Sequence, residues 1–205
     1  MMLSAPSIHA QVTAQQQYPG YNEETFMDMD FDPNLLTPEI PVTARGTVAD
    51  YIRKTANSLK SAYTIDLMRD DEVFIVSIPT DEVFLPNDTL LSAYAPKQLD
   101  PMLRLMSDPF MYKIVVAVHT DDTGSEHYRD MLSTARLNSI YDWLMDAIDS
   151  GILSEDLIII PFSMASSDPI QLNDTRAHRR ENRRIEFYFI PGPKMIELAQ
   201  KRQLK

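Results

Sequence analysis

Residues 112–136 read YKIVVAVHTDDTGSEHYRDMLSTAR and contain three successive patterns. Residues 112–118 are almost all apolar and mostly β-branched, which is typical of a strand buried inside a sheet. The polar segment 119–124 that follows predicts a loop. Beyond it, apolar residues recur at helical spacing, and Gly151 marks the end of a helix expected at about residues 125–150. A strand, a loop and a helix in this order indicate an α/β protein.

Strand and helix patterns alternate over most of the remaining chain as well. Each crossover helix must bury its apolar stripe against the sheet, so the alternation predicts a layered α/β sandwich with helices on one face. In addition to the elements above, we expect helices at residues 47–61, 96–107 and 175–180, and strands at residues 63–68, 72–78, 157–162 and 184–190.

Composition divides the chain into three segments. Residues 1–45 are polar and punctuated by prolines, which indicates a flexible, extended N-terminal segment. Residues 46–192 carry the periodic patterns and are expected to form one domain, whereas residues 193–205 form a short basic tail. Residues 7–11 resemble the end of a signal peptide that is cleaved after Ala10. The basic and apolar parts that normally precede such a site are missing, so an unstructured N-terminus is the alternative.

The chain carries a net charge of −11 and contains no cysteine. An acidic chain repels nucleic acid, because phosphate backbones are bound by basic surfaces. Without cysteine we expect no disulfide, no thiolate metal ligand and no lipid attached at an N-terminal cysteine. No stretch approaches the roughly 20 apolar residues of a transmembrane helix, so we expect no membrane span. A cluster of arginines within residues 176–184 departs from the acidic average. Such a cluster is more often a solvated helix face than an anion site, which is the alternative.

One charged pair does not fit the expected core. Asp121 lies in the loop after the buried strand, where α/β sheets commonly hold ligands. Arg136 interrupts the apolar stripe of the following helix, and a buried guanidinium needs a partner. A carboxylate can hold an ammonium group while a guanidinium holds a carboxylate, so the pair suits the zwitterionic end of an amino acid. Direct bridging between Asp121 and Arg136 is the alternative.

Three ordered motifs resemble those of a known family. The motifs are His119-Thr120-Asp121 followed by Gly124, Leu132-Ser133 followed by Arg136, and Arg179 followed by Asn182-Arg183-Arg184-Ile185-Glu186. With these spacings, residues 73–190 resemble the OmpA-like C-terminal domain, a peptidoglycan-binding family. The resemblance implies an α/β (α+β) two-layer sandwich in the order β-α-β-α-β-(α)-β. We expect a mixed sheet with helices on one face, preceded by an extra helix and hairpin.

In that family the domain binds the diaminopimelate residue of the peptidoglycan stem peptide without cleaving it. The resemblance implies that Asp121 holds the ligand's ammonium group and Arg136 its carboxylate, with Thr120 contributing beside Asp121. Asn182 and Arg183 are implied to line or brace the same pocket. We therefore expect a non-catalytic periplasmic protein with no cofactor and no metal, associated with the outer membrane through a partner. The N-terminal segment is expected to join an envelope protein complex.

The chain departs from the family pattern at two important positions. Val118 replaces a usual glycine, and Arg129 replaces a usual asparagine. Arg129 adds a second cation, which changes the anionic group that the site prefers, and we include it among the ligand contacts. One alternative is a protein–protein interaction module of a secretion or motility assembly, with lost or altered peptidoglycan binding. Another is an enzyme or metal site built from His119, Asp121 and His127, which no nucleophile spacing or glycine-rich phosphate loop supports.

Overall fold

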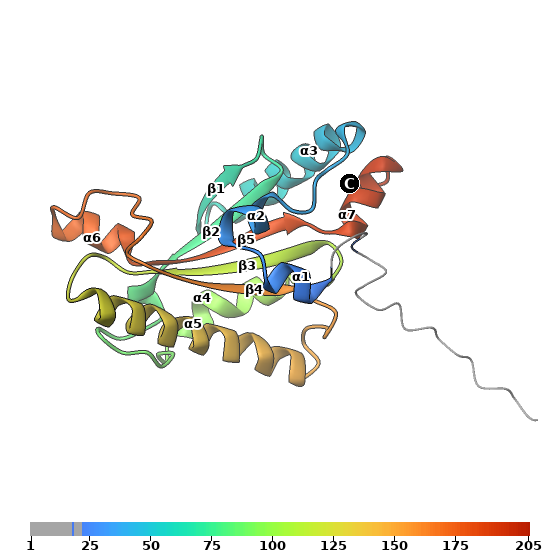
Figure 1. The fold of residues 1–205 in the computed structure, drawn as a ribbon. Coiled ribbons are helices and arrows are strands. Elements are labelled where there is room, and N and C mark those ends of the chain that lie inside the picture. Colours follow the sequence, from blue (N-terminus) through green and yellow to red (C-terminus); the bar gives the residue numbers. More distant parts are fainter. Residues whose placement is uncertain (1–17, 19–21) are drawn as a thin grey trace, which may run out of the picture.

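The computed structural model describes residue 18 and residues 22–205, and Figure 1 shows their arrangement. The strands are β1 (Thr64–Met68), β2 (Val73–Pro79), β3 (Tyr112–His119), β4 (Ile159–Ala165) and β5 (Arg184–Pro191). They form one sheet in the order β1-β2-β5-β3-β4. Strands β3 and β4 run parallel, whereas the other neighbouring pairs are antiparallel. The sheet is therefore mixed, as expected.

Helices lie on both sides of this sheet (Figure 1). They are α1 (Glu23–Met27), α2 (Phe31–Leu36), α3 (Val42–Leu59), α4 (Ala95–Leu103), α5 (Glu126–Asp149), α6 (Arg176–Asn182) and α7 (Pro193–Gln200), with a short 3-10 helix, η2 (Thr80–Glu82).

The central strands β3 and β5 are buried along their whole length. They pair with each other, and their register places Val116 opposite Phe187. Because successive side chains of a strand point to opposite faces, each central strand contributes to two hydrophobic cores. Burial on both faces also explains why the β3 sequence is an almost continuous apolar run rather than an alternating one.

The larger core lies between one face of the sheet and helices α3, α4, α5 and α7. Helix α5 crosses β3 and β4 and buries Ile140 and Leu144 there. Burial of each such side chain contributes about 1.5–3 kcal/mol. Residues from all four helices and from β2, β3 and β5 meet in this core, among them Val48, Ile52, Val76, Leu99, Met102, Val116, Phe187 and Met195.

The N-terminal segment covers the second face of the sheet. Tyr18, Phe26 of α1 and Leu35 of α2 are buried in a second apolar cluster that includes Val115 of β3 and Ile160 of β4. The rings of Tyr18 and Phe26 meet edge to face with their centroids 5.3 Å apart. The segment thus forms a further layer of the domain, because its apolar side chains are held by the sheet.

A buried lysine ties this segment to the sheet. The Nζ atom of Lys113, in β3, donates hydrogen bonds to the backbone oxygen of Asn34 at 2.7 Å and to its Oδ1 at 3.1 Å. The same atom lies 4.1 Å from the centroid of the Phe26 ring. Burial, together with a smaller effect of the nearby charge of Arg69, lowers the pKa of Lys113 to about 7. The N-terminal segment therefore supplies the partners without which this ammonium group would be buried alone.

The expected mixed sheet and the order of its elements are confirmed, including the extra helix and hairpin that precede the rest of the domain. The expectation of helices on one face holds for α3, α4, α5 and α7, but α1 and α2 cover the other face and add a third layer. The expectation of an extended chain is wrong for residues 22–45, which form α1, α2 and the start of α3. Helix α3 begins at Val42, so the expected boundary at residues 45 and 46 falls inside it. Contacts with the second face of the sheet stabilise these short helices, and nearby sequence does not reveal such contacts. Within the expected basic tail, residues 193–200 form α7.

Two expectations concern membranes and export. Among the described residues, no helix combines the length and the apolar character needed to cross a membrane. The signal-peptide interpretation concerns residues 7–11, which lie outside the described part of the chain.

Candidate functional site

A pocket of about 350 Å³ opens beside the loop that follows β3. The β3–α5 loop, the start of α5 and helix α6 lie at the same end of the sheet (Figure 1). The loop passes into α5 at Ser125, whose Oγ accepts a hydrogen bond from the backbone N–H of Tyr128 and so caps the helix. The pocket is lined by Asp81, Pro86, Asn87, Thr120, Asp121, Thr123, Tyr128, Arg129, Leu132, Arg136, Arg176 and Arg183.

Asp121 is 7% exposed and is held by two donors. Its Oδ2 lies 2.7 Å from Nη1 of Arg183, and its Oδ1 accepts a hydrogen bond from the backbone N–H of Thr123 at 2.9 Å. Burial raises the pKa of Asp121, but the hydrogen bonds from Arg183 and Thr123 outweigh burial and hold the pKa below its usual value. The pocket therefore contains an ionised carboxylate at neutral pH.

Arg136 is 4% exposed, and its side chain reaches the pocket from α5. Its Nε donates a hydrogen bond to the backbone oxygen of Asp88 at 2.9 Å, and its guanidinium carbon lies 5.0 Å from the centroid of the Phe84 ring. Within the described part of the chain, no carboxylate lies within ion-pair distance of this guanidinium. Burial lowers the pKa of Arg136, but an arginine stays charged at neutral pH.

The two residues of the expected pair line one pocket but do not bridge each other. Asp121 pairs with Arg183 instead, and Arg183 also donates to Oδ2 of Asp81 at 2.9 Å. One guanidinium thus joins the 3-10 helix η2 to the β3–α5 loop. The alternative of direct bridging between Asp121 and Arg136 is wrong, because Arg183 occupies the position of the cation beside Asp121.

Two other expected site residues lie close to this arrangement. Thr120 lines the pocket, and its Oγ1 donates a hydrogen bond to the backbone oxygen of Asp121 at 3.0 Å. Asn182 is fully buried and does not line the pocket. Its amide bonds to the backbone N–H and oxygen of Gln171 and to Oδ1 of Asn173, so it braces the loop before α6.

Arg129 lines the pocket from the first turns of α5. Its Nη1 donates hydrogen bonds to the backbone oxygens of Gly124 at 2.7 Å and of Asp122 at 3.3 Å. The chain at Gly124 has a φ of +87°, and a Cβ there would lie 2.9 Å from the Tyr128 ring. Only glycine fits this position without strain. The loop therefore has one well-defined conformation, and Arg129 is attached to it.

Sequence patterns did not identify several of the lining residues. Asp81 and Asn87 lie before β3 and were not among the expected site residues. Arg176 belongs to the arginine cluster for which the sequence favours a solvated helix face. That interpretation is incomplete, since Arg176 and Arg183 line the pocket and Arg184 is buried. The cluster itself was the signal that could have placed them in the site.

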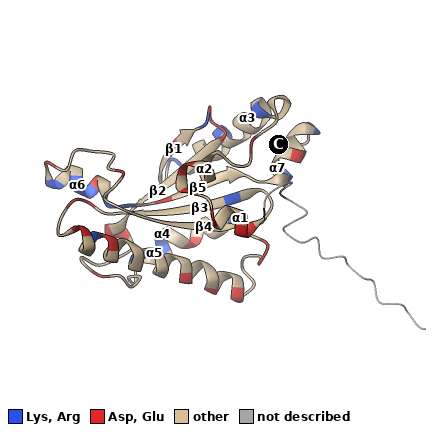
Figure 2. Ribbon diagram, in the orientation of Figure 1, with Lys and Arg blue, Asp and Glu red and all other residues tan. Residues whose placement is uncertain are grey.

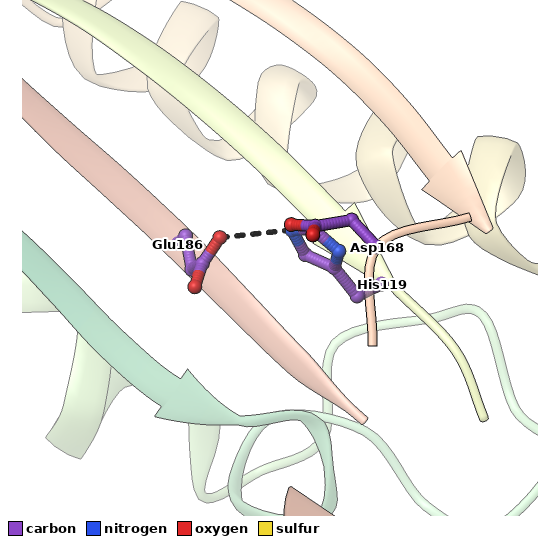
Figure 3. A group of neighbouring side chains, drawn as sticks. All are labelled: His119, Asp168 and Glu186. Carbon is purple, nitrogen blue, oxygen red and sulfur yellow. Dashed lines mark ion pairs between the residues drawn. The ribbon is translucent and has the colours of Figure 1, made fainter. Parts of the chain in front are cut away.

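His119, Asp168 and Glu186 form a second polar group (Figure 3). His119 is the last residue of β3, Glu186 lies near the start of β5, and Asp168 lies in the loop after β4. The Nε2 atom of His119 lies 2.9 Å from Oε2 of Glu186, although the ring N–H is not aligned with that oxygen for a hydrogen bond. Burial raises the pKa of Glu186, but His119 and Arg184 outweigh burial and hold the pKa at about 2. Glu186 is therefore an ionised carboxylate inside the fold.

The ligand-type atoms of these three residues lie within 4.8 Å of one another, so they are a geometric candidate for a metal ion. However, Arg184 already forms ion pairs with both carboxylates, with its Nε 2.6 Å from Oε1 of Glu186 and its Nη2 3.2 Å from Oδ2 of Asp168. The Tyr188 hydroxyl also donates to Glu186 at 2.6 Å. A metal cation would be repelled by the guanidinium, so a structural polar network accounts for the group best.

Comparisons with known proteins bear on the fold and the family. Residues 83–183 match the model of the OmpA family. No curated protein matches the chain. Among solved structures, a MotB-like protein from Desulfovibrio vulgaris is 21% identical with a TM-score of 0.58, and the match covers 72% of this chain and 95% of that one. The cell wall anchor of the T6SS from Pseudomonas aeruginosa is 17% identical with a TM-score of 0.50, covering 70% and 96% of the two chains.

A third solved structure, the periplasmic domain of MotB, is 18% identical with a TM-score of 0.50, covering 69% of this chain and 76% of that one. At such identities these likenesses concern the fold, and the family match concerns residues 83–183. That matched range contains Asp121, Arg129, Arg136 and Arg183.

Proposed function

We propose that this chain binds the stem peptide of peptidoglycan without cleaving it, because residues 83–183 match the model of the OmpA family. The bound group is diaminopimelate, a diamino diacid whose free end carries an ammonium and a carboxylate. By holding it, the domain anchors an envelope complex to the cell wall. The fold is shared with a cell wall anchor and with a periplasmic domain, which supports this assignment and a periplasmic location.

The observation that carries the proposal is the state of Arg136. Arg136 is 4% exposed and lines a pocket, and no carboxylate of the described residues lies within ion-pair distance of its guanidinium. A charge that is removed from water without a counter-ion is destabilising, so such an arginine is normally satisfied by an anion. The backbone oxygen of Asp88 and the Phe84 ring satisfy one edge and one face of it. The remaining N–H groups are available to a ligand carboxylate, which a guanidinium binds with two parallel hydrogen bonds.

Asp121 provides the opposite charge at the other wall of the pocket. Its carboxylate is ionised, and a ligand ammonium can bind lone pairs that Arg183 and Thr123 do not use. Arg183 competes with the ammonium for Oδ2, so ligand binding rearranges the contact between Arg183 and Asp121 or shares it. Thr120 holds the backbone of Asp121 in place, and Asn182 braces the neighbouring loop.

A purely binding role agrees with the chemistry of the pocket. Its lining has no cysteine, serine or histidine, and the nearest histidine, His119, is buried beside Glu186. His127, a residue of the alternative enzyme or metal site, is exposed on α5 and does not line the pocket. The residues of this pocket can therefore hold two opposite charges but contain no nucleophile paired with a base.

A second candidate function follows from the ion pair between Arg183 and Asp121. Since Asp121 already has a cation, the pocket is partly satisfied without a ligand. In that case the domain is an interaction module of an envelope assembly that retains the fold with altered peptidoglycan binding. Its N-terminal segment is then the part that contacts the partner complex.

Retention on purified cell-wall sacculi tests the proposal. The full chain is expected to co-sediment with sacculi that contain diaminopimelate, and the double variant Asp121→Ala with Arg136→Ala is expected to stay in solution. A matched control, Asp142→Ala with Arg104→Ala, removes the same charges from exposed positions and should sediment like the natural chain. Thermal unfolding of each variant establishes that it is folded. Retention of the site variant would reject the proposal, and failure of the natural chain to sediment would favour the interaction module.

A further inference from the structure

The pocket contains more positive charge than one carboxylate requires. Four arginines line it, whereas its acidic residues are Asp81 and Asp121. Both of these carboxylates are engaged by Arg183, which lies 2.9 Å from Asp81 and 2.7 Å from Asp121. Arg129, Arg136 and Arg176 are therefore left without a carboxylate partner in the part of the chain that the structure describes. In a chain with a net charge of −11, such a cluster of free cations is unusual.

Like Arg136, Arg129 is held in place by hydrogen bonds to backbone oxygens. Its Nη1 is bonded to two backbone oxygens of the β3–α5 loop, at Gly124 and Asp122. Its Nε is buried and has no hydrogen-bond partner among the described residues. Carbonyl oxygens orient a guanidinium but do not neutralise its charge. The loop thus holds Arg129 in a defined position at the pocket with its positive charge uncompensated.

Arg129 and Arg136 occupy distinct positions along the same wall. They are seven residues apart on α5, which is close to two full turns, so both project from the same face of the helix. Their Cα atoms are separated by about 10 Å along the axis at 1.5 Å per residue. The two oxygens of a carboxylate are only roughly 2 Å apart. One carboxylate therefore cannot form two parallel hydrogen bonds with both guanidinium groups at once. Figure 2 shows further basic residues on α6, at the same end of the sheet.

We propose that Arg129 forms a second anion subsite, and that the pocket selects stem peptides carrying a second free carboxylate over peptides in which that carboxylate is an amide. This inference rests on the proposed function, in which Arg136 holds the carboxylate of diaminopimelate. Arg129 then contacts a further carboxylate of the same peptide, and Arg176 on α6 adds long-range attraction. Amidation replaces an anion with a neutral group that the guanidinium binds more weakly.

Calorimetry of the full chain with two synthetic peptides tests the inference. Both contain diaminopimelate with its amino-acid end free, and they differ only in a second carboxylate that is free in one and amidated in the other. The natural chain is expected to bind the free peptide about tenfold more tightly, a ratio typical of one charge-assisted contact. The ratio should decrease as salt is raised, because the contact is between charges.

Variants of Arg129 assign the preference to that residue. Arg129→Gln is expected to reduce the ratio of the two affinities to near one, and Arg129→Lys to retain part of it because the charge is kept. Arg104→Gln, at an exposed position outside the pocket, should keep the full ratio. Equal affinities in the natural chain, or a full ratio in a folded Arg129→Gln variant, would overturn the inference and leave the proposed function standing. Absence of binding by either peptide would overturn both.

Discussion

Nη1 of Arg183 lies 2.7 Å from Oδ2 of Asp121 and links two segments that are 62 residues apart in sequence. The contact joins the end of α6 to the loop after β3, and the same guanidinium reaches Asp81 of η2. Three segments therefore meet at one side chain. This arrangement organises the pocket and sets the charge of its acidic wall.

Replacing Arg183 with glutamine is expected to lower the free energy of unfolding at pH 7 by about 1–2 kcal/mol, because the buried Asp121 carboxylate loses a charged donor. In a double-mutant cycle, Asp121→Asn should cost less stability when Arg183 is already absent. The folded pKa of Asp121 lies below its usual value of 3.8, so the contribution is present above that pH and is lost as the pH falls through the folded pKa. Denaturant unfolding at pH 7 and pH 3 measures it, and additive single effects would contradict a direct pairing.

Gly124 and Gly46 form a matched pair for testing the strain of the site loop. Gly124→Ala forces a side chain into a left-handed conformation and against Tyr128, so we expect a loss of about 1–2 kcal/mol and weaker ligand binding. Gly46 lies inside α3 with open space around it, and Gly46→Ala should instead stabilise the fold by about 0.5–1 kcal/mol. Thermal unfolding of both variants checks the prediction. Equal effects at the two positions would mean that the loop is not constrained as described.

Lys113 makes stability depend on pH in a range where few other groups titrate. Its folded pKa is about 7, compared with 10.5 when exposed, so the unfolded chain binds more protons between these values. Stability is therefore expected to rise as the pH increases from 7 to 9. A Lys113→Met variant should lack this rise, since it has no titrating group there. Chemical denaturation at each pH provides the comparison, and parallel curves for the two proteins would show that the Asn34 oxygens and the Phe26 ring keep Lys113 charged throughout.

Glu186 is expected to stabilise the fold down to acidic pH. Its folded pKa is about 2, compared with 4.5 when exposed, so its contribution is complete above pH 4.5 and is lost between pH 4.5 and 2. Glu186→Gln leaves Arg184 buried without its closest counter-ion and should cost about 3 kcal/mol at pH 7. The difference from the natural chain should shrink on acidification. The exposed Glu155→Gln serves as control, and a pH-independent difference for Glu186→Gln would argue against an ionised buried carboxylate.

The sheet could be predicted from sequence because its strands are marked by local patterns. Residues 112–118 and 184–190 are apolar runs that remain buried whatever their partners are. The helices α1 and α2 could not be predicted in the same way. Each is at most six residues long, and their stability depends on contacts such as that between Asn34 and Lys113, which are 79 residues apart. Short helices without tertiary contacts are not stable in water.

In the site, too, nearby sequence identifies some residues, whereas their contacts involve segments far apart in the chain. Asp121 stood out because it lies in the loop after a buried strand, and Arg136 because it interrupts the apolar stripe of a helix. Their actual partners did not, because Arg183 reaches Asp121 from another element and Arg136 meets Asp88 across 48 residues. Sequence spacing placed both residues near one loop. It could not show that Arg183, rather than Arg136, neutralises Asp121.

Arg136 is proposed to bind a ligand carboxylate, and calorimetric titration of the full chain with a diaminopimelate-containing stem peptide tests this role most directly. The natural chain is expected to bind one peptide per chain, and folded Arg136→Gln should bind at least about 100-fold more weakly, since a buried charge-assisted pair is lost. Arg104→Gln should bind like the natural chain. An affinity of Arg136→Gln equal to that of the natural chain, or no binding by the natural chain, would contradict the account.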